Sequence, residues 1–259
     1  MSQLPPDVIA DIVSRLVVKL LLRFRCVSKW WCALIDSPAF IKSHLNRSIE
    51  TNNHRSLFLK DSGATIDLES LEFDNPINWD DYFGAEMIGC CNGLLGFLSI
   101  DDHIVLLNPS TRKRQKLPFT PVEVPREPRC PCPDDGRVER CFCPNTAYDF
   151  GCDSVNDDYK VVRITQLYDK DDNDSFDSIV TIYSLKSNSW RRIQDFPYYF
   201  LHNRPDAALA SGAFHWVVSR RPYSDTVRVR AEVWVMKEYG VKESWTKLFC
   251  VAQRSTHYY

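Results

Sequence analysis

The sequence predicts an α+β protein in which a small N-terminal all-α bundle precedes an all-β repeat domain. Three observations lead to this prediction: apolar residues at helical spacing over the first 45 residues, short strand-like runs from about residue 55, and a strand–turn–strand pattern that occurs three times. The chain has 259 residues, which is enough for a small module over residues 1–45 and a domain with its own core over residues 46–259.

The helical region opens with an apolar stripe that fits one face of a helix. Its residues are Val8, Ile9, Ile12, Val13 and Leu16. A second run covers residues 21–27, and a third begins at Ser37–Pro38, where serine can cap a helix and proline can occupy its first position. A segment this short cannot bury enough surface to fold well alone, so we expect it to complete its core on a partner. The alternative is a helical cap on the following domain.

The β region contains three hairpins of one pattern, at residues 104–118, 179–193 and 232–249. Each has a strand, a polar turn and a second strand, and their starts lie about 50–75 residues apart. In the last two, Trp190 and Trp245 follow the turn, where each could pack its hairpin against the next sheet. The repetition predicts an array of β-sheets, whose commonest closed form is a propeller, and an ordinary β-sandwich is the alternative.

Composition excludes several classes of partner. The net charge of −2 gives no overall attraction to nucleic acid or to an anionic membrane, and no apolar run is long enough to span a bilayer. The first residues lack the basic and apolar parts of a secretory signal, so secretion is not expected. The ten cysteines are therefore expected to be reduced thiols, because thiols stay reduced in the cytosol and nucleus. We therefore expect a cytoplasmic and/or nuclear protein that binds neither nucleic acid nor membrane.

The chain contains no recognisable catalytic motif: there is no His-Glu-x-x-His, no Gly-x-Ser-x-Gly and no glycine loop for phosphate. We therefore expect a protein that is not an enzyme, with no catalytic residues and no cofactor. The acidic segment 169–177 lacks the sixth-position glycine of an EF-hand loop and has Val180 instead of glutamate at position twelve. It is expected to be a solvated hairpin loop rather than a calcium site.

Four cysteines at C-x-C-x8-C-x-C spacing form the most distinctive pattern outside the helices. They are Cys130, Cys132, Cys141 and Cys143. If Asp134–Gly136 turns a hairpin, the four sulfurs could converge on one face and accept tetrahedral zinc. Proline between the cysteines limits that segment to a sheet edge, so we favour a thiol-rich loop insertion without metal, with a zinc site or a redox-sensitive dithiol as alternatives. Elsewhere, Cys90–Cys91 is expected to be a buried apolar pair.

Specific residues of the helical region resemble a known motif. Leu4–Pro5, the segment Arg23–Lys29 and Trp31 are similar to a plant F-box, which binds a Skp-type adaptor in cullin-based ubiquitin ligases. Val17 stands where the family usually has proline, and Leu20 where it has serine, in the turn before the second helix. Proline would fix φ there and serine would cap the second helix, and losing such a cap costs about 0.5–2 kcal/mol. The resemblance therefore implies a weakened F-box.

The resemblance also assigns roles to individual positions. Carried from the family onto matching residues, the apolar anchors for the adaptor are Leu4, Pro5, Ile9, Ile12, Leu16, Leu21, Leu22 and Val27. Their implied role is to seat the helical bundle on the Skp-type protein and, through it, on a cullin.

Five segments of the β region are similar to the F-box-associated domain of plants, a kelch- or propeller-like domain. They are Cys91–Leu95, Asn108–Thr111, Asp153–Val162, Gly212–Trp216 and Val233–Tyr239, and the S-locus F-box proteins of pollen look most similar. The resemblance implies a substrate-recognition subunit of a Skp-cullin-F-box ubiquitin ligase. Its β-domain would hold a protein substrate for ubiquitination.

This resemblance is incomplete after Trp216. There the family runs through another repeat, whereas here only about ten residues precede the tryptophan–methionine strand, and the chain ends at Tyr259 soon after the third hairpin. Too few sheets would leave open edges that must be paired, covered or charged. Two alternatives follow: a truncated, non-receptor F-box protein that acts as a decoy, or a zinc-binding interaction module.

Overall fold

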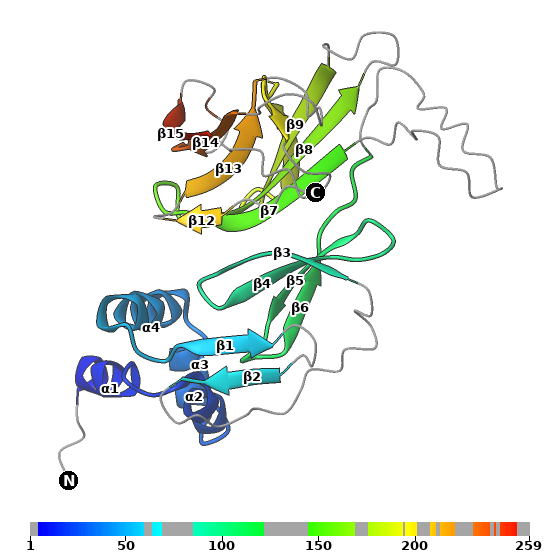
Figure 1. The fold of residues 1–259 in the computed structure, drawn as a ribbon. Coiled ribbons are helices and arrows are strands. Elements are labelled where there is room, and N and C mark those ends of the chain that lie inside the picture. Colours follow the sequence, from blue (N-terminus) through cyan, green and yellow to red (C-terminus); the bar gives the residue numbers. More distant parts are fainter. Residues whose placement is uncertain are drawn as a thin grey trace.

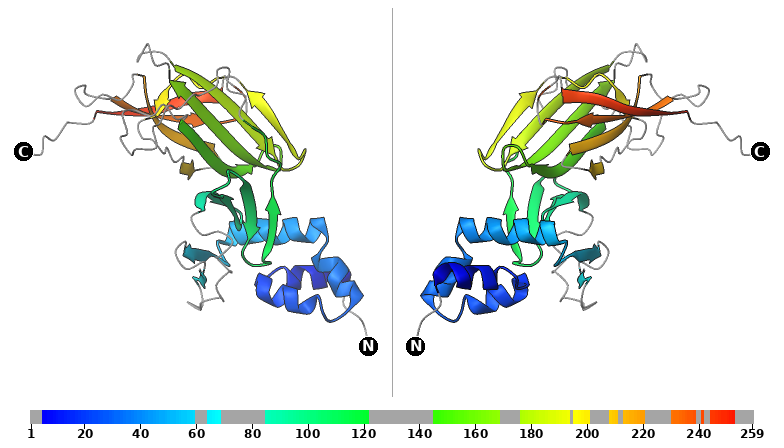
Figure 2. Two further views of the ribbon diagram at one scale, coloured as in Figure 1. Left: turned by 90° about the vertical axis from the view of Figure 1, so that its right-hand side faces the viewer. Right: turned by 90° about the vertical axis from the view of Figure 1, so that its left-hand side faces the viewer.

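The computed structural model describes residues 5–59, 64–68, 85–121, 145–168, 176–193, 195–200, 208–210, 213–220, 230–238, 241 and 244–252. Within these residues four helices precede a series of antiparallel β-sheets (Figure 1). The helices lie at one end of the molecule, the first four-stranded sheet lies next to them, and the other large sheets lie beyond it (Figures 1 and 2). The predicted α+β class, a helical bundle followed by β-sheets, is confirmed.

The helices are short, and two of them begin at a serine cap. They are α1 (Pro6–Val13), α2 (Val18–Phe24), α3 (Lys29–Ile35) and α4 (Pro38–Thr51). The Ser37 hydroxyl accepts a hydrogen bond from the Phe40 amide at 3.2 Å, which confirms the predicted start of α4, and Ser28 caps α3 in the same way. None of the helices that the structure describes is long and apolar enough to cross a bilayer.

The bundle has a small core to which each helix contributes one buried side chain. Val13, Leu21, Ile35 and Phe40 form it, and each is at most 6% exposed. The half-buried apolar residues around them are Ile9, Leu16, Phe24, Trp31 and Leu34. At about 1.5–3 kcal/mol for each fully buried side chain, four such residues supply a modest total. The bundle therefore has little core of its own, as its length predicts.

One hairpin and three larger sheets make up the β region. The hairpin pairs β1 (Ser56–Leu59) with β2 (Ala64–Asp67). The first sheet holds β3 (Glu86–Cys91), β4 (Leu94–Leu98), β5 (Ile104–Asn108) and β6 (Lys113–Lys116). The second holds β7 (Asn145–Asp153), β8 (Asp158–Tyr168), β9 (Phe176–Ser184) and β10 (Ser189–Ile193). The third holds β11 (Tyr199–Phe200), β12 (Ala208–Ala210), β13 (Ala213–Ser219), β14 (Arg230–Met236) and β15 (Trp245–Ala252).

All three predicted hairpins are present. They are β5–β6, β9–β10 and β14–β15, and each forms the last two strands of its sheet. Local chemistry shapes the turns: the Asn108 side chain accepts a hydrogen bond from the Thr111 amide at 3.0 Å, and Arg112 and Asn188 have positive φ values of 55° and 50°. Because each hairpin ends one sheet, the three copies of the sequence pattern correspond to the three large sheets.

The large sheets pack on one another in chain order, and the second sheet is buried on both faces. On β8, Val161 packs into the core shared with the first sheet, whereas Val162 packs into the core shared with the third. This alternation follows from the two-residue period of a strand. Trp245 packs against the core between the second and third sheets, with its ring 5.0 Å from that of Trp216. Trp190 packs against the core between the first and second sheets, so both tryptophans lie between sheets as predicted. The array is propeller-like, and the described strands form no closed ring.

Two glycines allow the first and second sheets to meet closely. A side-chain carbon on Gly89 of β3 would lie 2.6 Å from the carbonyl oxygen of Phe150 in β7, and the φ of Gly89 is 148°. A side-chain carbon on Gly96 of β4 would lie 3.0 Å from Cβ of Phe150. Glycine at both positions therefore lets Phe150 reach the core between these sheets, where it is 1% exposed.

Candidate functional site

The first three helices and the turns between them leave several large apolar side chains in contact with solvent. They are Val8, Ile12, Leu20, Val27 and Trp30, with exposed fractions between 38% and 63%, and they are called the exposed apolar set below. Large apolar residues exposed on one small module are typical of a surface that binds another protein. The bundle therefore presents a candidate docking surface.

The eight predicted adaptor anchors differ in how far solvent reaches them. Pro5, Ile12 and Val27 are exposed, Ile9, Leu16 and Leu22 are half-buried, Leu21 is buried, and Leu4 lies outside the described residues. Leu21 is 4% exposed and forms part of the bundle core, so its position suits it to hold the helices together. Ile12 and Val27 are the predicted anchors that also belong to the exposed apolar set.

Sequence reasoning did not single out Val8, Leu20 or Trp30 as candidate docking residues. For Trp30 the signal was present, because the neighbouring Trp31 lies four residues before the buried Ile35 and thus on the core face of α3. Trp31 stacks on Phe24 with ring centroids 5.6 Å apart, while Trp30 meets Trp31 edge-on and remains 45% exposed. The helical period therefore assigns Trp31 to the core and Trp30 to the surface.

The turn between α1 and α2 differs from the prediction at one position. The expectation that position 20 caps α2 is wrong, because the cap is Val17: the amides of Leu20 and Leu21 both donate to its carbonyl. Val17 offers no side-chain acceptor, and its backbone has φ −64° and ψ 149°. From α4, the ring nitrogen Nε2 of His44 donates to the Leu16 carbonyl at 2.9 Å, which supports the turn. A proline fits at position 17, since proline requires φ near −65°.

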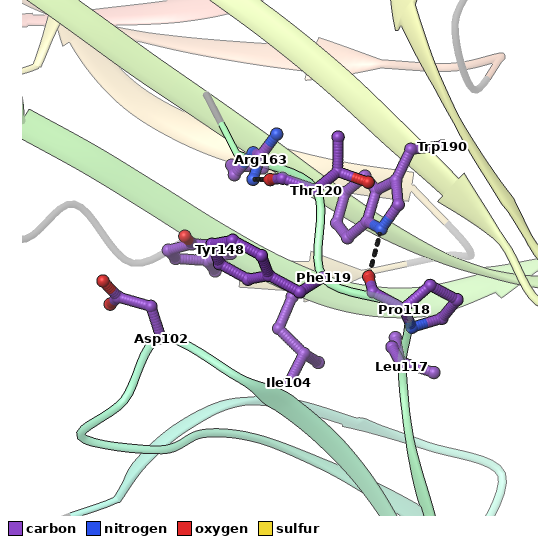
Figure 3. Close-up of a pocket in the computed structure, with 9 residues that line it drawn as sticks. All are labelled: Asp102, Ile104, Leu117, Pro118, Phe119, Thr120, Tyr148, Arg163 and Trp190. Atoms are coloured by element: carbon purple, nitrogen blue, oxygen red, sulfur yellow. Dashed lines mark hydrogen bonds between the residues drawn. The ribbon is translucent and has the colours of Figure 1, made fainter. Parts of the chain in front are cut away.

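A second candidate site is a cleft between the first and second sheets (Figure 3). The segment 117–120, which follows β6, forms one wall, and Tyr148, Arg163 and Trp190 form the other. The indole N–H of Trp190 donates to the Pro118 carbonyl at 2.9 Å and ties the walls together. Burial raises the pKa of the Tyr148 hydroxyl, although the neighbouring Arg163 acts in the opposite direction. Sequence spacing does not reveal this cleft, because its residues come from separate strands.

Helix α4 links the bundle to the second sheet. Arg47 of α4 donates to the Asp11 carboxylate of α1 at 2.8 Å, and hydrogen bonds from Arg15 and Arg47 lower the pKa of Asp11. On the other side, the Lys42 ammonium lies 2.5 Å from the Asp157 carboxylate in the turn between β7 and β8, and it lowers the pKa of Asp157. One helix therefore contacts both the candidate docking module and the sheet array.

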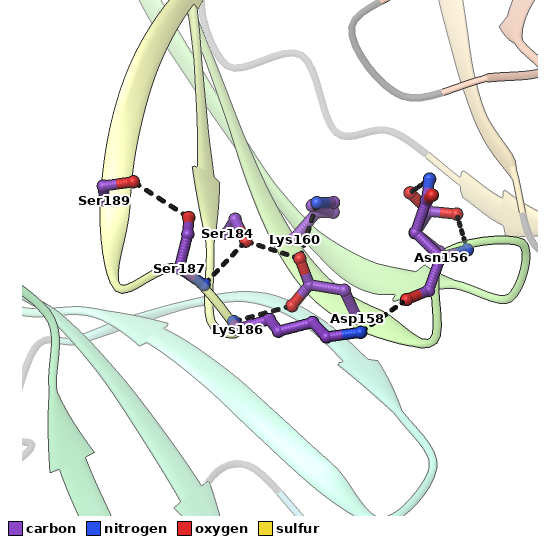
Figure 4. Close-up of polar contacts among 8 residues, drawn as sticks. Asn156, Asp158, Lys160, Ser184, Lys186, Ser187 and Ser189 are labelled. Atoms are coloured by element: carbon purple, nitrogen blue, oxygen red, sulfur yellow. Dashed lines mark hydrogen bonds and ion pairs between the residues drawn. The ribbon is translucent and has the colours of Figure 1, made fainter.

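The turn that receives α4 is held by a buried carboxylate (Figure 4). Asp158 accepts hydrogen bonds from Lys160 Nζ at 2.6 Å, Ser184 Oγ at 2.5 Å and the Lys186 amide at 2.8 Å. Burial alone would raise the pKa of Asp158, but these donors hold it below its ordinary value. The network joins the start of β8 to the turn between β9 and β10, directly beside the Asp157 that meets α4.

The cysteine predictions have different outcomes. Cys130, Cys132, Cys141 and Cys143 lie outside the described residues, and among the described ones no cluster of three or more His, Cys, Asp or Glu could hold a metal ion. The expectation that Cys90–Cys91 is a buried pair is wrong, because Cys90 is exposed and Cys91 is half-buried. Neighbouring residues of a strand face opposite sides, so only Cys91 turns toward Cys152, and burial raises its pKa to about 12.

Two protein families match the chain. The F-box associated beta propeller domain matches residues 48–228, and the F-box domain matches residues 1–43. F-box protein CPR1 of Arabidopsis thaliana is 32% identical, over 97% of this chain and 73% of its own length. A second F-box protein of that plant is 30% identical over 97% of this chain and 74% of its own length. An F-box/kelch-repeat protein is 25% identical over 96% of this chain and 79% of its own length.

A helical module with an exposed apolar surface, followed by stacked antiparallel sheets, defines a modular protein-interaction protein. The chain belongs to the F-box proteins that carry an F-box-associated β-propeller domain. This pair of domains supports a substrate-receptor role in Skp-cullin-F-box ubiquitin ligases in general, and F-box proteins are typically receptor subunits rather than enzymes. The relatives named above are Arabidopsis F-box proteins, so the likeness to S-locus F-box proteins stays a prediction.

The matched part of CPR1 is longer than this chain. The alignment extends over 317 positions, which exceeds the 259 residues of this chain, so part of the relative has no counterpart here. The match to the propeller family ends at residue 228, just before β14.

Proposed function

We propose that this chain is a substrate-recognition subunit of a Skp-cullin-F-box ubiquitin ligase, acting in the cytosol and/or nucleus. The helical bundle docks on a Skp-type adaptor and through it on a cullin, while the β-sheets hold a target protein for ubiquitination. The chain acts by proximity, because it brings the target next to a ubiquitin-charged enzyme and makes no bond itself. The two parts divide near residue 45, so the division falls within α4, which extends from Pro38 to Thr51.

The observation that carries this proposal is the position of Ile12 and Val27. Both occupy places where the F-box resemblance puts an adaptor anchor, and they are 50% and 63% exposed. Fully burying an apolar side chain of this size contributes about 1.5–3 kcal/mol, so a partner that covers both gains substantial affinity. Among the other assigned anchors, Ile9 and Leu16 pack against the bundle core and are expected to contribute to docking chiefly through the shape of the module.

The decisive experiment is co-expression of the full chain with a plant Skp-type adaptor, followed by size-exclusion chromatography. We expect the native chain to co-elute with the adaptor and the Ile12→Asp/Val27→Asp double variant to elute alone. The control is Ile49→Asp, which places one such charge on an apolar side chain of α4 that is 58% exposed and outside the exposed apolar set. The control is expected to co-elute like the native chain.

Either of two results contradicts the proposed docking. One is a double variant that still co-elutes with the adaptor, and the other is a native chain that is folded but never binds it. Circular dichroism of each variant distinguishes lost docking from lost folding, because both substituted side chains are exposed and their replacement leaves the bundle core intact. Proteins retained by the adaptor-bound complex then identify candidate targets.

The shortened β-domain favours a second candidate, a decoy that occupies the adaptor without delivering a target. On the third sheet, Val217, Val233 and Phe249 are cross-strand neighbours, and Val217 and Phe249 are 44% and 54% exposed. An apolar row of this kind is where a further sheet would pack. A monodisperse complex whose sheets resist proteolysis supports the receptor, whereas protease-sensitive sheets support the decoy. Metal analysis of the same sample tests the zinc-binding alternative on the four cysteines at 130–143.

A further inference from the structure

We propose that the cleft between the first and second sheets binds a carboxylate of the target protein, with Arg163 as the anion-binding group. This inference rests on the proposed receptor function and deepens it, because it names the chemistry by which the β-domain selects a target: an acidic peptide. Arg163, Trp190 and Tyr148 form one wall of the cleft, and the segment 117–120 forms the other (Figure 3).

The hydrogen-bonding capacity of Arg163 is only partly used. A guanidinium has five N–H groups. Its Nε donates to Thr181 Oγ1 at 3.0 Å, and its Nη1 donates to the Thr120 carbonyl at 2.7 Å. The Tyr148 hydroxyl also lies near the guanidinium, and the remaining N–H groups make no other hydrogen bond to the residues that the structure describes. Arg163 is 5% exposed and lines the cleft, so these donors can meet a ligand there.

The charge of Arg163 has no carboxylate partner within ion-pair distance among the residues that the structure describes. Both acceptors that this guanidinium contacts are uncharged. A buried charge without a partner is costly, and a charge-assisted bond to an anion is about twice as strong as a neutral hydrogen bond. An anionic ligand therefore gains more from this position than a neutral one.

Surrounding contacts hold the guanidinium in place before any ligand arrives. Its central carbon lies 4.9 Å from the centre of the Trp190 ring, and the Trp190 indole is itself fixed on the Pro118 carbonyl at 2.9 Å. Phe119 is 57% exposed at the mouth and meets the His103 ring with centroids 5.6 Å apart. A rigid cation beside an exposed aromatic ring suits a peptide in which an apolar residue accompanies an acidic one.

The composition of the cleft favours a carboxylate over a phosphate. It presents one buried cation, and Asp102 lies at its edge. A doubly charged phosphate generally needs several cationic or backbone donors, and Asp102 would repel it more strongly than it repels a singly charged group. Removing the charge of Asp102 should therefore tighten the binding of any anion at this position.

The test is nuclear magnetic resonance of the full-length chain, with Trp190 as the reporter. The indole N–H signal of Trp190 is assigned with Trp190→Phe and followed during titration with N-acetylglutamate α-amide. We expect a saturable shift that weakens as salt is added, and none with N-acetylglutamine α-amide, which has the same shape without the charge. A parallel titration with N-acetylalanine, whose only carboxylate is terminal, shows whether a side-chain or a C-terminal carboxylate is preferred.

Two variants complete the test. Asp102→Asn changes an exposed side chain at the mouth and is expected to tighten binding of N-acetylglutamate α-amide about threefold. Arg163→Lys keeps the charge but loses the planar donor array, and is expected to weaken binding at least about tenfold. Binding by Asp102→Asn that is unchanged or weaker contradicts the proposal, and this holds even if Arg163→Lys fails to fold.

Equal shifts with the glutamate and glutamine compounds, no shift with either carboxylate, or a response only to inorganic phosphate would each overturn the proposal. The proposed receptor function is scored separately by co-elution with the adaptor, which depends on the helical bundle. A chain that keeps the adaptor but ignores carboxylates therefore rejects the cleft proposal alone. A chain that binds carboxylates but no adaptor rejects the receptor function and leaves an acidic-peptide binding module.

Discussion

The helical bundle and the second sheet bury their apolar residues in opposite ways. Each helix gives one side chain to the bundle core, and seven large apolar residues of the helical region remain exposed. The second sheet lies between two other sheets, and both of its faces are buried. The sheets therefore act as partners for one another, whereas the bundle keeps apolar surface that the proposed adaptor would cover, and binding to the folded form alone would stabilise it. One chain thus combines a region whose sheets cover one another with a small module that leaves apolar side chains exposed.

The largest effect is expected from a large-to-small substitution in the core between the second and third sheets. Trp216 is fully buried, and its indole N–H donates to the Asp149 carboxylate at 3.1 Å. We expect Trp216→Ala to lower the free energy of unfolding of the sheets by about 3–5 kcal/mol, because it leaves a cavity that the neighbouring aromatic rings cannot fill. Urea denaturation followed by far-ultraviolet circular dichroism measures the loss.

The matched control for Trp216→Ala is Val217→Ala, the next residue on the same strand. Val217 is 44% exposed on the opposite face of the third sheet, so its truncation is expected to cost less than about 1 kcal/mol. Adaptor binding should survive in both variants, since the bundle has its own core. Similar losses for the two substitutions, or loss of adaptor binding with Trp216→Ala, would show that the two regions do not fold independently.

A smaller effect is expected from the carboxylate that holds the turn beside α4. Asp158→Asn should cost about 1.5–3 kcal/mol at neutral pH, since hydrogen bonds to a charged group contribute that much. The pKa of Asp158 is lowered in the folded chain, so the unfolded chain binds the proton more readily. The stabilisation is therefore fully present above the ordinary pKa of 3.8 and is lost as pH falls through the lowered pKa of the folded chain.

The measurement for Asp158 is the unfolding free energy of both chains from pH 7 down to pH 3. The gap between native chain and Asp158→Asn should be constant near neutrality and narrow at the acid end. Asp157→Asn is the control, because this neighbouring carboxylate is exposed and makes a single ion pair with Lys42. A gap that does not change with pH, or an equal cost for the control, would contradict the role given to Asp158.

The smallest effect on stability is expected from a substitution in the helical bundle, at the cap of α2. Val17→Pro should stabilise the chain by about 0.4–1 kcal/mol, because the native φ of −64° already suits proline and the substitution restricts the unfolded chain. Pro5 occupies the equivalent cap position of α1 with φ −57°. Differential scanning calorimetry should show a higher melting temperature for the transition of the bundle. The control is Arg23→Pro at an exposed position beyond the first turn of α2, where proline removes an intrahelical hydrogen bond and is expected to destabilise the bundle by about 3 kcal/mol.

The features predicted correctly from sequence depend on residues close together in the chain. The cap at Ser37 and the three hairpins each follow from a few adjacent residues, so local patterns were sufficient. Position 20 was mistaken for a cap because the start of α2 is set by backbone geometry at Val17, where the side chain gives no signal. The cleft was missed because Arg163 contacts the Thr120 carbonyl from 43 residues away in the sequence, and the periodicity of apolar residues does not predict such a contact.

The ion pair between Lys42 and Asp157 has a consequence for the geometry of a ligase. Its side chains are 57% and 67% exposed, so dissolved salt screens the attraction over about 8 Å at physiological ionic strength. A link of this kind restrains rather than locks the angle between the bundle and the sheets. Under the proposed receptor function, movement of the array about this link would set which lysines on a bound target come within reach of transfer. Ionic strength would then influence how many sites of a single target are modified.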